Sequence, residues 1–260
     1  MALALITGGS SGLGVDFAHI LAELKYDLIL VARSEQKMQA IAQKLSKEHG
    51  VRCFVIAKDL SKPGSAAELF QAIESSDDYH SVDILINNAG YGQWGAFGQS
   101  DFDSLTTMLQ LNMNTLAELM RLFLPQMISR GHGQILNVAS TAAFQPGPWM
   151  AAYYASKSFV LSLGEAVSTE LKGTGVTITT LCPGPTKTEF FERANIGNSR
   201  LKSLFMADSM TCARRGVKAM LAGNTVVIDG WLNFIFSQTA RLMPRAIVRT
   251  ITGKINAAVK

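Results

Sequence analysis

Short apolar runs alternate with longer segments of helical periodicity along most of this chain, and that alternation restricts the fold more than any other feature. The apolar runs, expected to be buried strands, are 2–7, 27–32, 51–57, 82–86, 134–139, 176–182 and 225–228. The expected helices are 12–24, 34–49, 63–75 (with Ser61 as its N-cap), 101–129 and 152–172. This order predicts an α/β, doubly wound parallel Rossmann sheet of about seven strands over residues 1–230. Residues 231–260 are expected to form a helical extension packed on the same domain or on a partner.

The net charge of +4 is unevenly distributed. Residues 231–260 contain five basic residues and no acidic one, so the first 230 residues carry a net charge of −1 and give no reason to expect a nucleic-acid partner. The hydrophobic fraction of 48% excludes a long disordered chain, and no apolar run is long enough for a membrane span. No signal-peptide pattern is present and the three cysteines lack a CxxC spacing, which predicts a cytoplasmic protein.

The glycine-rich segment TGGSSGLG at 7–14 joins the first expected strand to the first expected helix. Glycine permits positive φ and lets the backbone approach a ligand closely, and a helix N-terminus presents free N–H groups to an anion. The segment therefore predicts a dinucleotide pyrophosphate site made by Gly8, Ser10, Ser11, Gly12, Leu13 and Gly14.

Arg33 stands at the end of the second expected strand, where NAD-binding proteins usually have an acidic residue for the ribose hydroxyls. A guanidinium forms charge-assisted hydrogen bonds with a 2′-phosphate. The residue favours NADP(H) over NAD(H) as cofactor. The alternative is that Arg33 is a solvated surface residue.

Tyr153 and Lys157 are four residues apart at the start of an expected helix, so their side chains share one face. A nearby cation should lower the tyrosine pKa and make it a usable proton donor to a carbonyl group. Ser140 closes the fifth expected strand, at the same edge of the sheet. Tyr154 is also near Lys157 in principle, so spacing alone does not choose between the two tyrosines.

Together these pieces resemble the short-chain dehydrogenase/reductase family, in its compact branch. The motifs that carry the resemblance over about residues 2–230 are TGxxxGxG at 7–14, Asp59-Leu60, Asn87-Asn88-Ala89-Gly90, Asn112, Ser140, Tyr153-x-x-x-Lys157 and Pro183-Gly184. The run Leu111-Asn112-Met113-Asn114 and the extended C-terminus are most similar to the bacterial-type broad-specificity carbonyl reductases.

The resemblance implies a role for each matching residue. Tyr153 would be the acid/base, Lys157 would bind the nicotinamide ribose and depress the Tyr153 pKa, and Ser140 would hold the substrate carbonyl. Asn112 would hold a water of the proton relay. The remaining cofactor contacts implied are Asp59 and Leu60 at the adenine, Asn88, Ala89 and Gly90 at the adenosine ribose, and Pro183, Gly184, Thr186 and Thr188 around the carboxamide.

Apolar side chains follow the late strands and predict a hydrophobic ketone, aldehyde or alcohol as substrate. They are Phe190, Phe191, Leu201, Leu204, Phe205, Met206 and Met210 in an expected lid, with Trp94, Phe97, Phe144 and Trp149 in other loops. Two alternatives stay open: a 3-oxoacyl-carrier-protein reductase, whose acidic partner would dock on Arg214, Arg215 and Lys218, and a non-catalytic dinucleotide sensor. No metal is expected, because the four histidines show no ligand spacing, and Cys182 is expected to be a buried apolar residue. The family implies a homodimer or homotetramer formed through the two long helices.

Residues 231–260 form a basic and apolar segment that Pro244 should divide into two helices. Val248, Ile251 and Ile255 are expected to share one face, with Arg245 and Arg249 to its side. Such a helix suits peripheral contact with an anionic membrane. The alternatives are a cover for the substrate pocket and a subunit interface.

Overall fold

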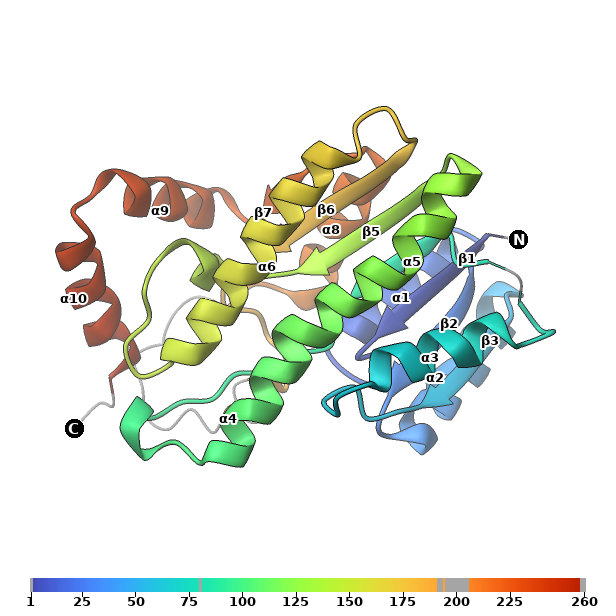
Figure 1. Ribbon diagram of the computed structural model, residues 1–260, viewed down its shortest axis with the longest axis horizontal. Coiled ribbons are helices and arrows are strands. Elements are labelled where there is room, and N and C mark those ends of the chain that lie inside the picture. The colour runs from blue at the N-terminus through green and yellow to red at the C-terminus, as the bar shows by residue number, and fades with distance from the viewer. Residues whose placement is uncertain (1, 80, 191–193, 195–205, 258–260) are drawn as a thin grey trace.

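Seven parallel strands form one sheet in the order β3-β2-β1-β4-β5-β6-β7, the arrangement expected of a doubly wound Rossmann fold (Figure 1). The computed structural model describes residues 2–79, 81–190, 194 and 206–257. The strands are β1 (Leu3–Thr7), β2 (Asp27–Ala32), β3 (Cys53–Ala57), β4 (Ile84–Asn87), β5 (Gly133–Val138), β6 (Val176–Cys182) and β7 (Val226–Ile228). The strand order reverses between β1 and β4, which is where open α/β sheets bind ligands.

Helices cover both faces of this sheet (Figure 1). One core cluster packs α1 (Leu13–Glu23), α2 (Glu35–His49) and α8 (Ser209–Leu221) on the first face. The other packs α3 (Ser65–Glu74), α5 (Leu116–Arg130) and α6 (Ala151–Glu170) on the second. Because both faces are buried, the inner strands β1 and β4 are buried at every position, which explains their continuous rather than alternating apolar pattern.

The expected helix at 101–129 is interrupted in the structure. It consists of α4 (Phe102–Leu109), a π-helical turn (Gln110–Thr115) and α5. Asn112 lies in this π-helical turn and is 1% exposed. π turns inside helices are frequent at functional sites. The expected cap of α3 was wrong: Gly64 occupies the N-cap position, while the Ser61 hydroxyl donates to Asp59 Oδ1 at 2.6 Å.

Two C-terminal helices, α9 (Trp231–Leu242) and α10 (Arg245–Asn256), follow β7 and lie beyond the carboxyl ends of the strands (Figure 1). Pro244 is the N-cap of α10, as expected. The side of α10 that carries Val248 and Ile251 is only partly covered, because Val248 is buried whereas Ile251 is 47% exposed. The inward face carries Val248, Thr252 and Asn256. Within the described ranges, no helix has the length and apolar character of a membrane span.

Candidate active site

The glycine-rich loop turns sharply between β1 and α1. A Cβ on Gly14 would come within 2.1 Å of the Gly8 carbonyl oxygen, and Gly12 has a positive φ of 54° with Thr188 next to it. Ser10, Ser11 and Leu13 are half-buried in the same loop. No side chain among the described residues caps the N-terminus of α1, so its first N–H groups face the loop without a side-chain acceptor. A tight backbone cradle at a helix N-terminus fits the pyrophosphate of a dinucleotide.

Thr7 and Asn88 brace this loop against β4. The Thr7 hydroxyl donates to the Ile86 carbonyl oxygen at 3.2 Å and accepts from the backbone N–H groups of Asn88 and Ala89, both at 3.0 Å. Asn88 Nδ2 donates to the Thr7 carbonyl oxygen at 2.9 Å. These bonds fix the ends of β1 and β4 relative to each other at the point where the strand order reverses. The sequence pattern contained Thr7 but did not assign it this positioning role.

Arg33 and Asp59 are close together at the carboxyl ends of β2 and β3. Partial burial acts to raise the pKa of Asp59, but hydrogen bonds from Ser61 and the charges of Arg33 and Lys62 bring it below its ordinary value. Arg33 is exposed and also acts on Tyr91, so its charge reaches the rim of the site. Leu60 is 4% exposed, and its side chain packs in the hydrophobic core next to the site.

Tyr153 is at the start of α6, 8% exposed, and surrounded by apolar side chains. Its ring centroid is 5.2 Å from that of Phe190 and 6.1 Å from that of Tyr154. Burial raises the pKa of Tyr153 above its ordinary value, although a hydrogen bond from Ser140 acts to lower it. The expected net lowering of this pKa was wrong, because desolvation of the phenolate outweighs the hydrogen bond from Ser140.

Lys157 is 6% exposed, and its Nζ donates to the Val138 carbonyl oxygen at 2.8 Å, 5.9 Å from the Tyr153 ring centroid. Burial lowers the pKa of Lys157 from 10.5 to about 8, so the ammonium is still the main form at neutral pH. A Cβ on Gly90 would be 3.5 Å from Lys157 Nζ and 3.0 Å from Asn112 Oδ1, which places all three residues together.

Asn112 is held from three directions. Its Oδ1 accepts from the Tyr91 N–H at 3.1 Å, and its Nδ2 donates to the Tyr91 carbonyl oxygen at 2.9 Å and to Ser156 Oγ at 3.1 Å. The π-helical turn aims the side chain inward to make these bonds. Tyr91 and Ser156 therefore support the site, and no short-range pattern in the sequence marks them.

The loop after β6 approaches the site from the opposite side. The Pro183 carbonyl oxygen accepts from the Thr141 N–H at 2.8 Å and from Ser140 Oγ at 3.4 Å, so this loop orients Ser140. Thr186 Oγ1 donates to the Gly184 carbonyl oxygen at 2.9 Å, and Thr188 lies against Gly12 of the phosphate loop. The structure thus brings the residues predicted at the carboxamide next to those predicted at the pyrophosphate.

Tyr153 packs in a cluster of apolar side chains. Its cluster contains Met108, Ala142, Met150, Tyr154 and Ala194, with Tyr91, Trp94, Leu105, Leu109, Ala152, Phe190 and Met206 packed against them. Of the other residues predicted here, Phe97 and Trp149 are exposed, Phe144 lies under Arg241, and Met210 packs in the core. Phe191, Leu201, Leu204 and Phe205 lie outside the described residues.

The C-terminal helices reach the same loops, which the sequence left open. Asn256, fully buried, accepts from Trp94 Nε1 through its backbone oxygen at 2.8 Å and from the Tyr154 hydroxyl through Oδ1 at 3.3 Å. Its Nδ2 donates to the Pro148 carbonyl oxygen at 3.1 Å. One residue near the end of the chain therefore fastens three segments around Tyr153, and Tyr154 serves this contact.

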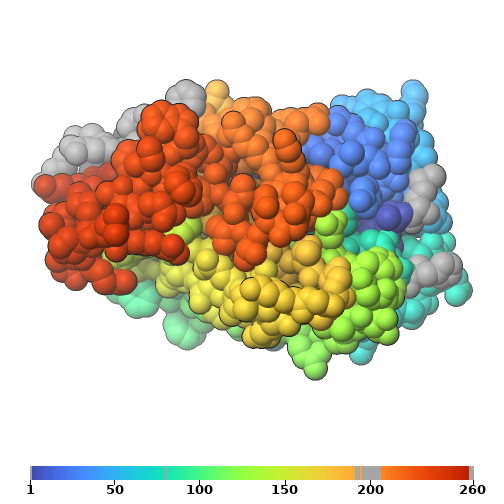
Figure 2. Space-filling model, turned by 90° about the horizontal axis from the view of Figure 1, so that it is seen from above, coloured from blue at the N-terminus to red at the C-terminus, as the bar shows by residue number. Residues whose placement is uncertain are grey.

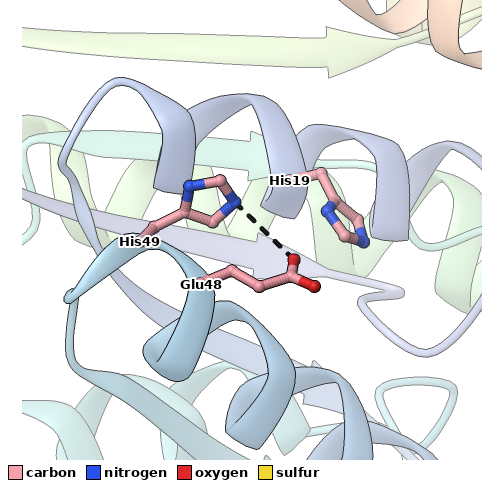
Figure 3. Close-up of side chains that lie close together, drawn as sticks. All are labelled: His19, Glu48 and His49. Atoms are coloured by element: carbon pink, nitrogen blue, oxygen red, sulfur yellow. Dashed lines mark ion pairs between the residues drawn. The ribbon is translucent and has the colours of Figure 1, made fainter.

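His19, Glu48 and His49 form a polar cluster between α1 and α2 that sequence spacing did not indicate (Figure 3). Their ligand atoms lie within 4.8 Å of one another, and His49 Nε2 is 4.0 Å from Glu48 Oε2. Ligands of one zinc ion are about 3.3 Å apart, given Zn–N bonds of about 2 Å. The side chains would have to move inward to share an ion.

Cys182 lies close to Lys157 but is fully buried, and burial raises the pKa of its thiol to about 12. The thiol is therefore neutral at physiological pH and is a poor nucleophile. This agrees with the expectation that Cys182 is a small buried apolar residue.

Comparison with known proteins shows which families and structures the chain resembles. The family model for short chain dehydrogenases matches residues 2–198. Ketoacyl reductase HetN from Nostoc sp. is 34% identical over 180 residues, which cover 69% of this chain and 62% of that protein. A short-chain dehydrogenase from Sphingobium yanoikuyae in complex with NADPH superposes with a TM-score of 0.82 at 29% identity, covering 93% of this chain and 94% of that one. The bulky-bulky ketone specific alcohol dehydrogenase from Comamonas testosteroni gives 0.78 at 28%, covering 93% and 92%.

Proposed function

The chain belongs to the short chain dehydrogenase family of oxidoreductases, and we propose that it transfers a hydride between NADP(H) and a hydrophobic ketone or aldehyde, or the matching alcohol. The observation that supports this most is the convergence of Ser140, Tyr153, Lys157 and Asn112 at one edge of the sheet, with apolar residues around Tyr153. The cofactor supplies the hydride, and the protein supplies orientation and a proton.

Tyr153 acts as the proton donor in this proposal. Its raised pKa keeps the hydroxyl protonated at neutral pH, so it can deliver a proton to a carbonyl oxygen held between it and Ser140. Two donors on one oxygen stabilise the negative charge that develops there. Lys157 holds a positive charge behind Tyr153, and Asn112, fixed by Tyr91 and Ser156, orients the groups that resupply the proton.

The preference for NADP(H) rests on Arg33. Its exposed guanidinium lies near Asp59 at the end of β2, and the structural relative from Sphingobium yanoikuyae is described with NADPH. In the proposal, Gly8, Ser10, Ser11, Gly12, Leu13 and Gly14 hold the pyrophosphate, Asp59, Leu60, Asn88, Ala89 and Gly90 the adenosine, and Pro183, Gly184, Thr186 and Thr188 the nicotinamide side.

A second candidate is reduction of a 3-oxoacyl thioester, because one relative is named a ketoacyl reductase. Two of the three basic residues expected to receive an acidic carrier protein, Arg214 and Arg215, are engaged within the chain, however. Arg214 forms an ion pair with Glu23 at 2.9 Å, and Arg215 pairs with buried Asp229 at 2.6 Å. This pairing favours a free hydrophobic substrate over a carrier-bound one.

We also propose that the protein is cytoplasmic, that it assembles as a homodimer or homotetramer through α5 and α6, and that residues 231–260 make peripheral contact with a membrane. The family's habit of assembly supports the second point. The exposed small residues Ala155, Ser162 and Ala166 of α6 would let two such helices approach closely.

The decisive experiment measures NADPH and NADH consumption with a panel of hydrophobic ketones, aldehydes and 3-oxoacyl thioesters. Turnover of free carbonyl compounds with NADPH supports the proposal. Turnover restricted to thioesters would select the second candidate. Dinucleotide binding without turnover of any substrate would instead indicate a non-catalytic sensor.

A further inference from the structure

The two C-terminal helices bury mainly small uncharged polar side chains and expose their large apolar ones. The buried residues of α9 and α10 are Ser237, Val248, Thr252 and Asn256, of which only Val248 is apolar. Ser237 and Thr252 satisfy their hydroxyl groups on carbonyl oxygens of their own helices, at 2.8 and 2.9 Å. A helix that packs on its own protein normally does the reverse. The outward side of these helices therefore has the character of a contact surface.

We call this outward side the C-terminal apolar face. It consists of Trp231, Leu232, Phe234, Ile235, Phe236, Leu242, Ile247 and Ile251, each at least 46% exposed. These are eight of the fourteen exposed large hydrophobic residues in the described part of the chain, and they occupy only two helices. Figure 2 shows these helices together over one end of the molecule. Such a concentration marks an interaction site rather than ordinary scatter.

The charges beside this face select its partner. Arg241, Arg245, Arg249 and Lys254 are exposed on the same two helices, and residues 231–260 contain no acidic side chain. Arg241 also stacks over Phe144, at 5.6 Å from its ring centroid. A symmetric contact between two copies would bring like charges together without a counter-charge. An anionic bilayer accepts the aromatic and aliphatic side chains at its interface and attracts the cations around them.

We propose that the C-terminal apolar face docks on an anionic lipid bilayer and brings the substrate pocket to its surface. Asn256 provides the link, because it fastens the end of α10 to Trp94, Pro148 and Tyr154 beside the pocket. Trp149, which follows Pro148 in the same loop, is also exposed. The substrate class is then a carbonyl compound dissolved in the bilayer, an inference that rests on the proposed function.

The test of docking is flotation of the full-length protein with vesicles, independent of any activity. We expect binding to phosphatidylcholine–phosphatidylglycerol vesicles, weaker binding at physiological salt, and little binding to phosphatidylcholine alone. The double substitution Phe236→Ser/Leu242→Ser should weaken binding about tenfold or more, through lost apolar burial. The double reversal Arg245→Glu/Arg249→Glu should weaken it about 25-fold or more, since each cation contributes about fivefold.

Matched controls separate the face from general surface effects. Phe102→Ser removes an equally exposed aromatic side chain from α4, and Lys37→Glu/Lys172→Glu makes the same change in net charge on the body. Both should bind vesicles like the unaltered protein. Equal affinity for neutral and anionic vesicles, or no binding to either, would overturn the proposal. So would a drop in oligomer mass, measured by light scattering, when Phe236 and Leu242 are replaced.

A second arm tests substrate delivery. With a water-soluble ketone and no vesicles, the Phe236→Ser/Leu242→Ser protein should reduce the ketone with NADPH at the same rate as the unaltered protein. With a long-chain ketone dissolved in anionic vesicles, its rate should fall by the same factor as its binding. Equal loss in both assays would refute delivery from the bilayer. Absence of ketone reduction by the unaltered protein would reject the proposed function, while the flotation result would stand on its own.

Discussion

The sheet body and the C-terminal helices differ in which side chains they bury and which they expose. In the body, strands such as β1 are buried throughout, and buried polar groups such as Asn112 and Thr7 have specific partners around the site. In α9 and α10, the buried side chains are mostly small and polar, whereas the aromatic ones are exposed together with the basic ones. Contacts within the chain explain which side chains of the body are buried. In our proposal, the exposed apolar side chains of the C-terminal helices are explained by contact with a surface outside the chain.

The largest expected effect concerns two adjacent tyrosines that serve the two regions. Tyr153→Phe should reduce kcat about 10²- to 10⁴-fold, because it removes the proton donor, and leave NADPH binding nearly unchanged. Tyr154→Phe is the matched control: it removes only the hydrogen bond to Asn256, so its loss of turnover should be far smaller. Steady-state kinetics and fluorescence titration with NADPH distinguish them. Equal losses would mean that the spacing to Lys157 does not identify the donor.

Two phenylalanines test the burial rule directly. Phe123 is 1% exposed and contacts Phe70 edge-to-face at 5.0 Å, whereas Phe236 is 66% exposed. Phe123→Ala should lower the free energy of unfolding by about 3–5 kcal/mol, and Phe236→Ala should change it by less than about 0.5 kcal/mol. Urea unfolding without vesicles measures both. A large loss for Phe236→Ala would show that its side chain is covered in solution.

Lys157 gives a pH-dependent prediction for the body. Its pKa of about 8 in the folded protein lies below its ordinary value of 10.5, so between these pH values the unfolded chain binds more protons than the folded protein. The contribution of Lys157 to the free energy of unfolding therefore rises by about 3 kcal/mol as the pH increases from about 8 to 10.5. In urea unfolding, Lys157→Met should lose this rise, and exposed Lys37→Met should keep it. Parallel profiles for all three proteins would contradict the burial effect.

The smallest effect concerns cofactor choice. Arg33→Ala should weaken NADPH binding about 10- to 100-fold through loss of charge-assisted hydrogen bonds of about 1.5–3 kcal/mol, and leave NADH binding unchanged. Lys37→Ala, on the adjoining helix α2, is the control and should affect neither cofactor. Titration with both dinucleotides is the measurement. Equal weakening of both would make Arg33 a general electrostatic contributor rather than a 2′-phosphate ligand.

Much of the fold followed from the sequence because each strand is short, apolar and bounded by a turn. The strand boundaries differ from expectation by two residues or fewer, as in β3 (Cys53–Ala57) against 51–57. The π-helical turn was not predictable, because Gln110–Thr115 continues the helical pattern on both sides. Ser61 is not the cap because α3 begins at Ser65 after Gly64, and the Ser61 hydroxyl donates to Asp59 instead.

Within the site, the residues of the motifs were predictable and their supports were not. Tyr91, Ser156 and Asn256 act through contacts across 21 to 162 residues, which no local spacing encodes. The pKa of Tyr153 likewise depends on how completely its neighbours remove water, so a sequence argument from the nearby cation gave the wrong sign.

The sequence by itself determined the parallel sheet, the phosphate loop and the residue types of the site, because periodicity and glycine placement act locally. It also determined that the net positive charge comes from the last thirty residues. Only the tertiary structure decided which sides of α9 and α10 face outward. In α10, three hydrogen bonds between Asn256 and distant segments hold the side with Val248, Thr252 and Asn256 inward, because buried polar groups need partners, and Ile247 and Ile251 are left exposed.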